Sequence, residues 1–265
     1  MIISIEGLDR SGKTTLINTL KALIAKTNQA HQFVFTKETN ISANPVADPL
    51  LYQQSQFLLN PKFSHHDNQL EPTYVISPLH RNLLFASLRA HNYYQVIKPA
   101  LDANQNVIID RQIHSSFAYA LNDVMMQKYW NREIANGRFA NKAAIIEQLL
   151  NLYLLSANHY IPDLVFYLDV PLAILEQRRY QQKTSWSQPQ LNQDAIEAQY
   201  DQDQIHWQAV ANEYQACFDY VQTPYGKKST VVKLDGLLSP QQLANQVFQT
   251  INQYSKSQQL DFKIR

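Results

Sequence analysis

Residues 2–16 read IISIEGLDRSGKTTL. The stretch opens with β-branched residues typical of a strand, turns at a glycine, and continues with the apolar spacing of a helix. Within it, residues Gly7 to Thr14 match the pattern G-x-x-x-x-G-K-[ST] in full. A strand before and a helix after are the context in which this pattern folds as a phosphate-binding loop. We therefore predict that this loop binds the phosphates of a nucleotide.

Each part of the loop has a chemical task. The glycines let the backbone curl so that successive N–H groups face phosphate oxygens, and the following helix adds its positive end. Lys13 is expected to reach the β and γ phosphates, and the Thr14 hydroxyl is expected to bind Mg²⁺. The residues predicted to bind the nucleotide phosphates are Gly7, Leu8, Asp9, Arg10, Ser11, Gly12, Lys13, Thr14 and Thr15.

Further along the chain, short apolar runs predict strands, and apolar residues at helical spacing predict helices. The predicted strands are 2–5, 33–35, 107–109, 164–170 and 231–234. The predicted helices are one from Lys13, 78–101, 141–160, one from Pro171, 194–220 and 240–254. Because the strands are apolar throughout, both faces of a parallel sheet are expected to be covered by helices. We predict one α/β domain over residues 1–265, with an irregular insertion around 41–77 and a lid around 178–193.

Composition excludes several classes of protein. The 265 residues carry 23 Lys and Arg against 22 Asp and Glu, which argues against nucleic acid or an anionic membrane as the main partner. The absence of a long apolar run and of a signal peptide predicts a cytoplasmic protein without a membrane span. The single cysteine, Cys217, excludes a disulfide framework and is expected to be buried. The pair His65-His66 lacks partner ligands at usable spacing and is expected in an exposed loop.

Three more segments follow predicted strands or lie on the long helix beside them. In residues 83–91, Phe85 and Arg89 are four positions apart, so an aromatic ring and a guanidinium share a helix face. In residues 110–119, Arg111 directly follows a buried strand, where its guanidinium can donate two hydrogen bonds to a phosphate. Residues 35–38 bring a cation and a carboxylate to the same edge of the sheet. We expect these segments to form the site of a phosphate acceptor.

Through these motifs the chain resembles the thymidylate (dTMP) kinase family of P-loop nucleoside monophosphate kinases. The segments similar to the family are 5–9, Thr36-Lys37-Glu38, 83–91 with 97–101, 162–170 and 234–236. The most specific likeness is Asp110-Arg111 followed by Ser115-Ser116 and Ala118-Tyr119. The resemblance implies a P-loop NTPase three-layer α/β/α sandwich, with a five-stranded parallel sheet in the order 2-3-1-4-5 flanked by helices. It also implies ATP and Mg²⁺, transfer of the γ-phosphate to dTMP, and a homodimer.

The resemblance assigns roles residue by residue. Phe85 would stack on thymine, and Arg89 would hydrogen-bond its carbonyl. Arg111 and Lys37 would hold the dTMP phosphate. Arg10 would neutralise charge on the transferred group, and Arg178, at the start of the predicted lid, would add to this and contribute to ATP binding with residues 7–15. The implied substrate-binding residues are Asp9, Lys37, Phe85, Arg89, Arg111, Ser115, Ser116 and Tyr119, the implied catalytic residues are Lys13, Arg10 and Arg111, and the implied metal residues are Thr14 and Asp110.

The chain also departs from the family pattern. Thr39-Asn40 replaces the usual Pro-Gly-Gly, and the lid lacks the Asp-Arg-x-Glu pattern. Two alternatives therefore stay open. One is a deoxynucleoside kinase or a related protein with another acceptor, for which Glu38 would serve as a carboxylate base for a hydroxyl nucleophile. The other is an ATP-binding P-loop protein without kinase activity.

Overall fold

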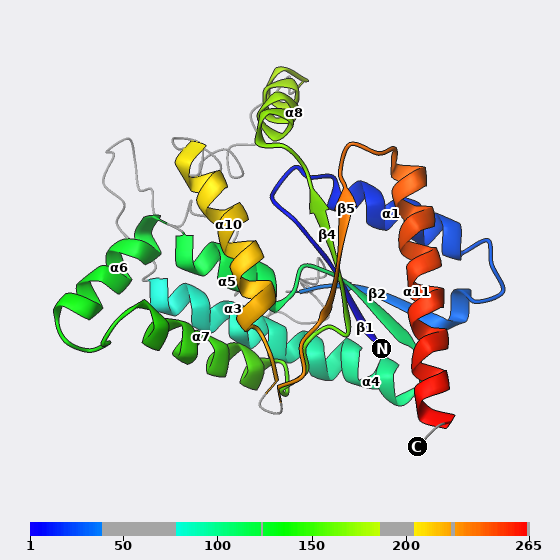
Figure 1. The fold of residues 1–265 in the computed structure, drawn as a ribbon, viewed down its shortest axis with the longest axis horizontal. Coiled ribbons are helices and arrows are strands. Elements are labelled where there is room, and N and C mark those ends of the chain that lie inside the picture. Colours follow the sequence, from blue (N-terminus) through cyan, green and yellow to red (C-terminus); the bar gives the residue numbers. More distant parts are fainter. Residues whose placement is uncertain (39–77, 123, 186–203, 224–225, 264–265) are drawn as a thin grey trace, which may run out of the picture.

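The computed structural model describes residues 1–38, 78–122, 124–185, 204–223 and 226–263. Five parallel strands form one sheet in the order β2-β3-β1-β4-β5. Their bounds are β1 Ile2–Glu6, β2 Phe33–Lys37, β3 Asn106–Asp110, β4 Leu164–Asp169 and β5 Thr230–Asp235. The predicted strand order and the parallel α/β architecture are confirmed (Figure 1).

Helices connect the strands and cover the sheet. Their bounds are α1 Lys13–Ile24, η1 Ala30–Gln32, α3 Pro78–Asn92, η3 Tyr93–Ile97, α4 Lys98–Asp102, α5 Ile113–Asn122, α6 Val124–Ala135, α7 Lys142–Ser156, α8 Leu172–Ser185, α10 Gln204–Tyr220 and α11 Pro240–Lys263. In Figure 1, α1 and α11 lie on one side of the strands, and α5, α7 and α10 lie on the other. The three-layer arrangement is therefore the one predicted.

Side chains of β1 alternate between two hydrophobic core clusters, one on each face of the sheet. Ile3 and Ile5 pack with α1 and α11, whereas Ile2 packs with η3 and α4. Because successive strand side chains point to opposite faces, Ser4 and Glu6 lie on the same face as Ile2. Glu6 is the last residue of the strand and is fully buried. A carboxyl group is thereby placed inside the molecule at the edge where the strands end.

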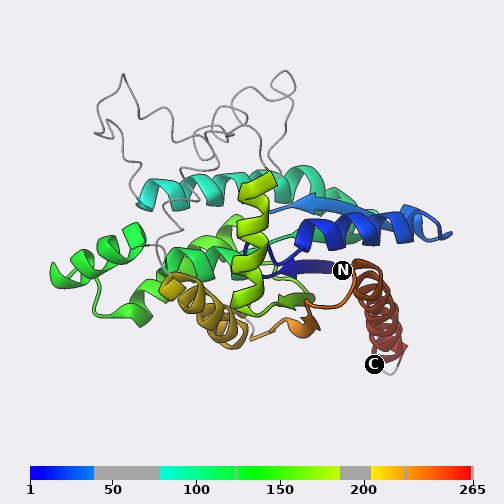
Figure 2. The ribbon, with the colours of Figure 1, turned by 90° about the horizontal axis from the view of Figure 1, so that it is seen from above.

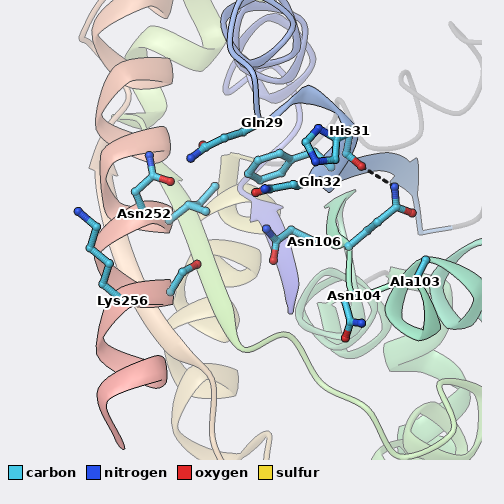
Figure 3. A pocket seen from close by; sticks show the side chains of 12 residues that line it. Gln29, His31, Gln32, Ala103, Asn104, Asn106, Asn252 and Lys256 are labelled. Carbon is cyan, nitrogen blue, oxygen red and sulfur yellow. Dashed lines mark hydrogen bonds between the residues drawn. The ribbon is translucent and has the colours of Figure 1, made fainter. Parts of the chain in front are cut away.

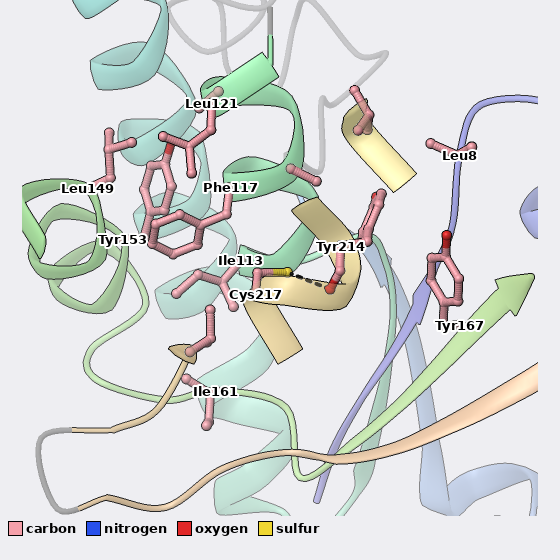
Figure 4. Packing of buried hydrophobic residues seen from close by; sticks show 14 of the residues in the cluster. Leu8, Ile113, Phe117, Leu121, Leu149, Tyr153, Ile161, Tyr167, Tyr214 and Cys217 are labelled. Carbon is pink, nitrogen blue, oxygen red and sulfur yellow. Dashed lines mark hydrogen bonds between the residues drawn. The ribbon is translucent and has the colours of Figure 1, made fainter. Parts of the chain in front are cut away.

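The largest core cluster lies between α5, α7, α10 and the sheet (Figure 4). Tyr153, Phe117 and Tyr214 have no more than a trace of exposed surface there. Cys217 is fully buried in the same cluster, and its thiol lies 3.2 Å from the carbonyl of Tyr214. The prediction that the cysteine is a buried apolar residue is confirmed.

Several element bounds differ from the prediction. The helix predicted over 78–101 contains a π-helical turn, η3, just before Pro99, which cannot donate a backbone hydrogen bond. The predicted helices do not include α5 and α6, since residues 110–119 were interpreted only as site residues and no element was predicted over 124–135. Helix α8 begins one residue after Pro171, and α11 runs nine residues beyond the predicted end at Tyr254. The insertion at 41–77, His65-His66 and residues 194–203 lie outside the described residues.

Candidate active site

The carboxyl ends of β1, β2, β3 and β4 meet at one edge of the sheet, and the glycine loop after β1 curls there. Gly7 has φ +144°, and a Cβ at this position would lie 2.9 Å from Ser11 Oγ and 3.0 Å from the carbonyl oxygen of Leu168. Gly12 has φ +102°. Both conformations favour glycine, so the two glycines of the motif are required by the shape of the loop.

Lys13 folds back under this loop. Its ammonium donates to the carbonyl oxygens of Gly7 at 3.1 Å and Leu8 at 2.7 Å, and its side chain is buried. Burial, followed by the positive charge of Arg111, lowers the pKa of Lys13 to about 7. An anion placed at the loop would favour the charged form of this ammonium.

Two residues in the first turn of α1 face solvent. Thr14 and Thr15 are exposed there, directly after the loop, while Arg10 is half-buried with φ +63°. A positive φ is rare for a residue with a side chain, so the loop imposes this conformation on Arg10. The structure thus places every residue from 7 to 15 in one loop-and-helix unit, as the motif predicted.

Arg178 supports the loop from outside. One guanidinium nitrogen donates to the carbonyl oxygens of Arg10 at 3.2 Å and Ser11 at 3.0 Å. The other donates to the carbonyl oxygen of Gly236 at 3.2 Å. A residue of α8 therefore ties the loop to the turn after β5. Figure 2 shows α8 crossing above the strand ends.

Arg111 lies where the loop and β3 meet. Its Nη1 donates to the carbonyl oxygen of Gly7 at 3.2 Å, and its Nη2 pairs with the carboxylate of Asp9. The guanidinium also lies 5.1 Å from the ring centre of Tyr119, whose hydroxyl accepts the backbone N–H of Asp9 at 3.2 Å. Arg111, Asp9 and Tyr119 were predicted from separate parts of the sequence, and the structure brings them together.

A second cluster contains Arg89. This guanidinium is buried and bonds to Glu38 Oε1, to the hydroxyl of Ser116 and, at 2.9 Å, to the hydroxyl of Ser156. Its charge is neutralised within the protein by Glu38, which also accepts from Ser116 at 2.5 Å. Ser156 is a contact that the sequence analysis missed.

The predicted aromatic and cationic neighbours of Arg89 lie beside this cluster. Phe85 is half-buried and packs against Leu88 on α3, while Lys37 ends β2 with its side chain exposed. The backbone of Lys37 is held by Asn92, whose side-chain amide donates to its carbonyl oxygen at 2.8 Å. Asn92 was also missed, since an asparagine on a helix gives no sign in the sequence of a partner across the sheet.

Ser115 belongs to a buried network under Arg111. Its hydroxyl donates to Glu6 Oε2 at 2.5 Å, accepts from Arg111 at 3.2 Å and lies 2.6 Å from the hydroxyl of Tyr214. The other oxygen of Glu6 accepts the backbone N–H of Gln112 at 2.8 Å. Burial raises the pKa of Glu6 to about 8. Neither Glu6 nor Tyr214 was assigned a role from the sequence. Glu6 comes directly after the apolar residues of its strand, and Tyr214 lies among the apolar residues of its helix.

The site can be tested for its fit to Mg²⁺. Asp110 Oδ1 is buried and has no hydrogen-bond partner among the described residues. Thr14 is exposed in the first turn of α1, directly after the loop, and Asp110 ends β3 in register with Ile5 of the neighbouring strand β1. Oxygen ligands of this kind suit Mg²⁺, which commonly takes one or two protein ligands with substrate phosphates and water completing its shell. The described residues contain no group of three or more His, Cys, Asp or Glu placed to hold a metal by themselves.

One cavity of about 610 Å³ lies at the opposite edge of the sheet (Figure 3). It is bounded by η1, the turn before β3 and α11, with Gln29, Asn104, Asn252 and Lys256 among its lining residues. No residue assigned to the nucleotide site lines it. The chemistry of the chain is therefore concentrated at the carboxyl edge, the usual place for ligands in open α/β sheets.

Comparison with known proteins identifies relatives of this chain. Residues 65–137 match the family model described as thymidylate kinase. The thymidylate kinase of Acinetobacter baumannii strain AYE is 32% identical over 174 residues, which cover 66% of this chain and 69% of that protein. That of Latilactobacillus sakei is 29% identical over 194 residues, covering 72% and 74%, and that of Chlorobaculum tepidum is 27% identical over 184 residues, covering 69% of each. Within the described ranges, no helix has the length and apolarity needed to cross a membrane.

Proposed function

Since this chain belongs to the thymidylate kinase family, we propose that it transfers the γ-phosphoryl group of ATP to dTMP, giving ADP and dTDP. The observation that carries this proposal is the meeting of Arg111 with the phosphate loop. Its guanidinium bonds to the carbonyl of Gly7 and to the carboxylate of Asp9. A planar guanidinium at this point is suited to hold an acceptor phosphate next to the phosphates bound by the loop.

The transfer would proceed in line, without a covalent intermediate. The second pKa of a phosphate monoester is about 6, so the attacking oxygen of dTMP is ionised at neutral pH and needs no general base. The task of the protein is to position both phosphates and neutralise their charge. Lys13, Arg10 and Arg111 are the catalytic residues of this proposal.

The remaining residues would bind the two nucleotides. ATP would be held by residues 7–15 and Arg178, and dTMP by Asp9, Lys37, Phe85, Arg89, Arg111, Ser115, Ser116 and Tyr119. Thr14 and Asp110 would hold Mg²⁺, which neutralises phosphate charge when bound. The buried, unpartnered oxygen of Asp110 supports this assignment. Residues 178–185 lie within α8, at the start of the proposed lid.

The test is ADP release from ATP with Mg²⁺ across a panel of acceptors: dTMP, dUMP, dCMP, dGMP, thymidine and none. Preference for dTMP supports the proposal. Preference for thymidine would favour a deoxynucleoside kinase with Glu38 as its base, and absence of acceptor-dependent turnover would mean an ATP-binding protein only. Lys13→Ala is the inactive reference, expected to lose on the order of 10³-fold in kcat. Lys26→Ala, an exposed lysine after α1, is the matched control and should retain activity.

We also propose that the chain is one domain that acts as a cytoplasmic homodimer. Large exposed apolar side chains support the dimer, because most of them come from helices that pack together. Leu83 lies on α3, Tyr94 on η3 and Leu155 on α7, and Leu155 is 69% exposed. Light scattering on the purified chain would give its mass in solution, and replacing Leu155 with Glu should favour the monomer.

A further inference from the structure

Tyr214 is a core residue whose hydroxyl lies at the carboxyl edge of the sheet, beside the phosphate loop. It lies in the middle of α10, which packs on α5, and its side chain is fully buried. Figure 4 shows it between α5 and the loop that carries Leu8. Its ring packs on Tyr167, with ring centres 5.3 Å apart, and on Phe218 at 6.3 Å. These contacts fix the direction of the Tyr214 hydroxyl.

That hydroxyl lies within hydrogen-bond distance of three groups. Arg111 Nη1 is 3.0 Å away, the hydroxyl of Ser115 is 2.6 Å away, and the carbonyl oxygen of Gly7 is 3.3 Å away. A phenol has one proton and two lone pairs, so it can accept from a guanidinium while it donates elsewhere. Because the proton of Ser115 is donated to Glu6, the Tyr214 hydroxyl donates to Ser115, and a lone pair of Tyr214 remains for Arg111.

Arg111 depends on such contacts because it is held in an unusual conformation. Its φ is +64°, which is rare for a residue with a side chain and requires support from its surroundings. Nη2 is directed by Asp9, and Nη1 by Gly7, Ser115 and Tyr214. Tyr214 is the contact of Nη1 that comes from the distant helix α10, so it couples that helix to the guanidinium.

We propose that Tyr214 is a positioning residue that fixes the guanidinium of Arg111 for the acceptor phosphate. This inference rests on the proposed function and adds a residue that does not touch either nucleotide. Its contact with Arg111, at 3.0 Å, is shorter than its contact with Gly7 of the loop, at 3.3 Å, so we expect the hydroxyl to affect the acceptor more than ATP. The ring fills the core, whereas the hydroxyl sets the direction of one guanidinium nitrogen.

Tyr214→Phe separates the two roles, because it keeps the ring and removes the hydroxyl. We expect KM for dTMP to rise about 10-fold, since a hydrogen bond to a charged group is lost, while KM for ATP changes less than about twofold. Tyr167→Phe is the matched control. It removes a hydroxyl from the same aromatic cluster, and within the described structure no hydrogen bond joins that hydroxyl to Arg111, so both KM values should remain those of the unmodified protein.

A double-mutant cycle tests whether the effect passes through Arg111. The ratio kcat/KM for dTMP is measured for Tyr214→Phe, Arg111→Ala and the pair, at saturating ATP. We expect Tyr214→Phe to have no further effect once Arg111 is absent, because coupled residues are not additive. Additive losses, an unchanged KM for dTMP, or an equal rise for ATP would each overturn the inference.

Two further results keep the test decisive. If Tyr214→Phe folds poorly, Tyr214→Met replaces it, because methionine also lacks the hydroxyl and its flexible apolar side chain fills irregular core space. It should give the same selective rise in KM for dTMP, and no rise would overturn the inference. If the unmodified protein does not phosphorylate dTMP, the proposed function itself fails. That outcome differs from an active protein in which Tyr214→Phe changes nothing, which refutes the positioning role alone.

Discussion

Glu38 and Arg89 form an ion pair that is almost closed to solvent, with 2.5 Å between Oε1 and Nη2 and side-chain exposures of 10% and 2%. Glu38 directly follows β2, and Arg89 lies on α3. The pair therefore ties the proposed acceptor helix to the sheet. Ser116 and Ser156 bond to the same guanidinium, which leaves Arg89 held from β2, α5 and α7 at once.

Removal of one partner of this pair should destabilise the fold. Glu38→Ala leaves a buried guanidinium without its counter-charge, and such a change typically costs about 3–5 kcal/mol of unfolding free energy. Urea denaturation followed by circular dichroism measures the loss. Asp102→Ala breaks the exposed pair Lys98–Asp102 and should leave the denaturation midpoint unchanged. A Glu38→Ala midpoint equal to that of the unmodified protein would contradict the structural role of the pair.

The buried carboxyl of Glu6 predicts a loss of stability at alkaline pH. Burial raises the pKa of Glu6 from 4.5 to about 8. Between these values the folded chain keeps a proton that the unfolded chain has released. The stability contributed by neutral Glu6 is therefore complete below pH 4.5 and is lost as the pH rises to about 8, at up to about 1.4 kcal/mol per pH unit.

His114 has the opposite effect on the acid side. Burial lowers its pKa from 6.5 to about 3, and neither ring nitrogen has a hydrogen-bond partner among the described residues. Below pH 6.5 His114 is protonated in the unfolded chain and remains neutral in the folded chain. The free energy of unfolding therefore falls as the pH falls. The contributions of Glu6 and His114 cancel between about pH 4.5 and 6.5. Lys13, whose pKa is lowered by burial to about 7, acts in the opposite direction to Glu6 above that pH, because the unfolded chain keeps a proton that the folded chain releases. We therefore expect a plateau between about pH 4.5 and 6.5, a clear decline on the acid side and a shallow decline on the alkaline side.

Urea midpoints measured from pH 4 to 8.5 in EDTA, without nucleotide, test this curve. Glu6→Gln should remove the alkaline decline, because glutamine cannot titrate. It should also move the onset of the acid decline from about pH 4.5 to about pH 6.5, because Glu6 no longer offsets His114. Glu176→Gln, an exposed change on α8, serves as the control and should keep both declines. An alkaline decline that persists in Glu6→Gln would assign it to another group.

The sequence predicted the frame of the site because that frame depends on local rules. A β-branched strand, two glycines with positive φ and the helix from Lys13 lie in a single stretch, so their geometry follows from short-range chemistry. Apolar strands likewise predicted the parallel sheet. Arg111 lies beside Gly7 and Asp9, and its role at the acceptor phosphate stays a prediction.

Contacts between distant elements could not be predicted in the same way. Tyr214 lies among apolar residues of α10, including Val210 and Cys217, and this spacing predicts only a core face. Its hydroxyl acquires a partner because α10 packs on α5, which is a tertiary contact without a local signal. Ser156 and Asn92 were missed for the same reason. Resemblance to the family assigned Arg89 to a base carbonyl, and it could not reveal that Glu38 already pairs with this guanidinium.

Arg111→Ala should raise KM for dTMP and leave the affinity for ATP almost unchanged. The guanidinium lies at the proposed acceptor phosphate, so KM for dTMP should rise at least about 10-fold, because a charged hydrogen bond is lost. The proposal assigns ATP binding mainly to backbone N–H groups of the loop, so the affinity for ATP should change little. Steady-state kinetics for dTMP and calorimetric titration with ATP measure the two effects. Arg132→Ala, an exposed arginine on α6, is the control. An equal loss of affinity for dTMP and for ATP would contradict the assignment of Arg111 to the acceptor.

Arg178→Ala should instead weaken the binding of ATP. This guanidinium binds the carbonyl oxygens of Arg10 and Ser11, so its loss frees the loop segment whose N–H groups are proposed to face phosphate. We expect KM for ATP to rise about 10-fold, with KM for dTMP within about twofold of its original value. Arg178→Lys should not restore ATP binding, because one ammonium cannot reproduce the fork that also reaches Gly236. If Arg178→Ala raised KM for dTMP alone, α8 would support the acceptor half of the site and the proposed division between the two nucleotides would be wrong.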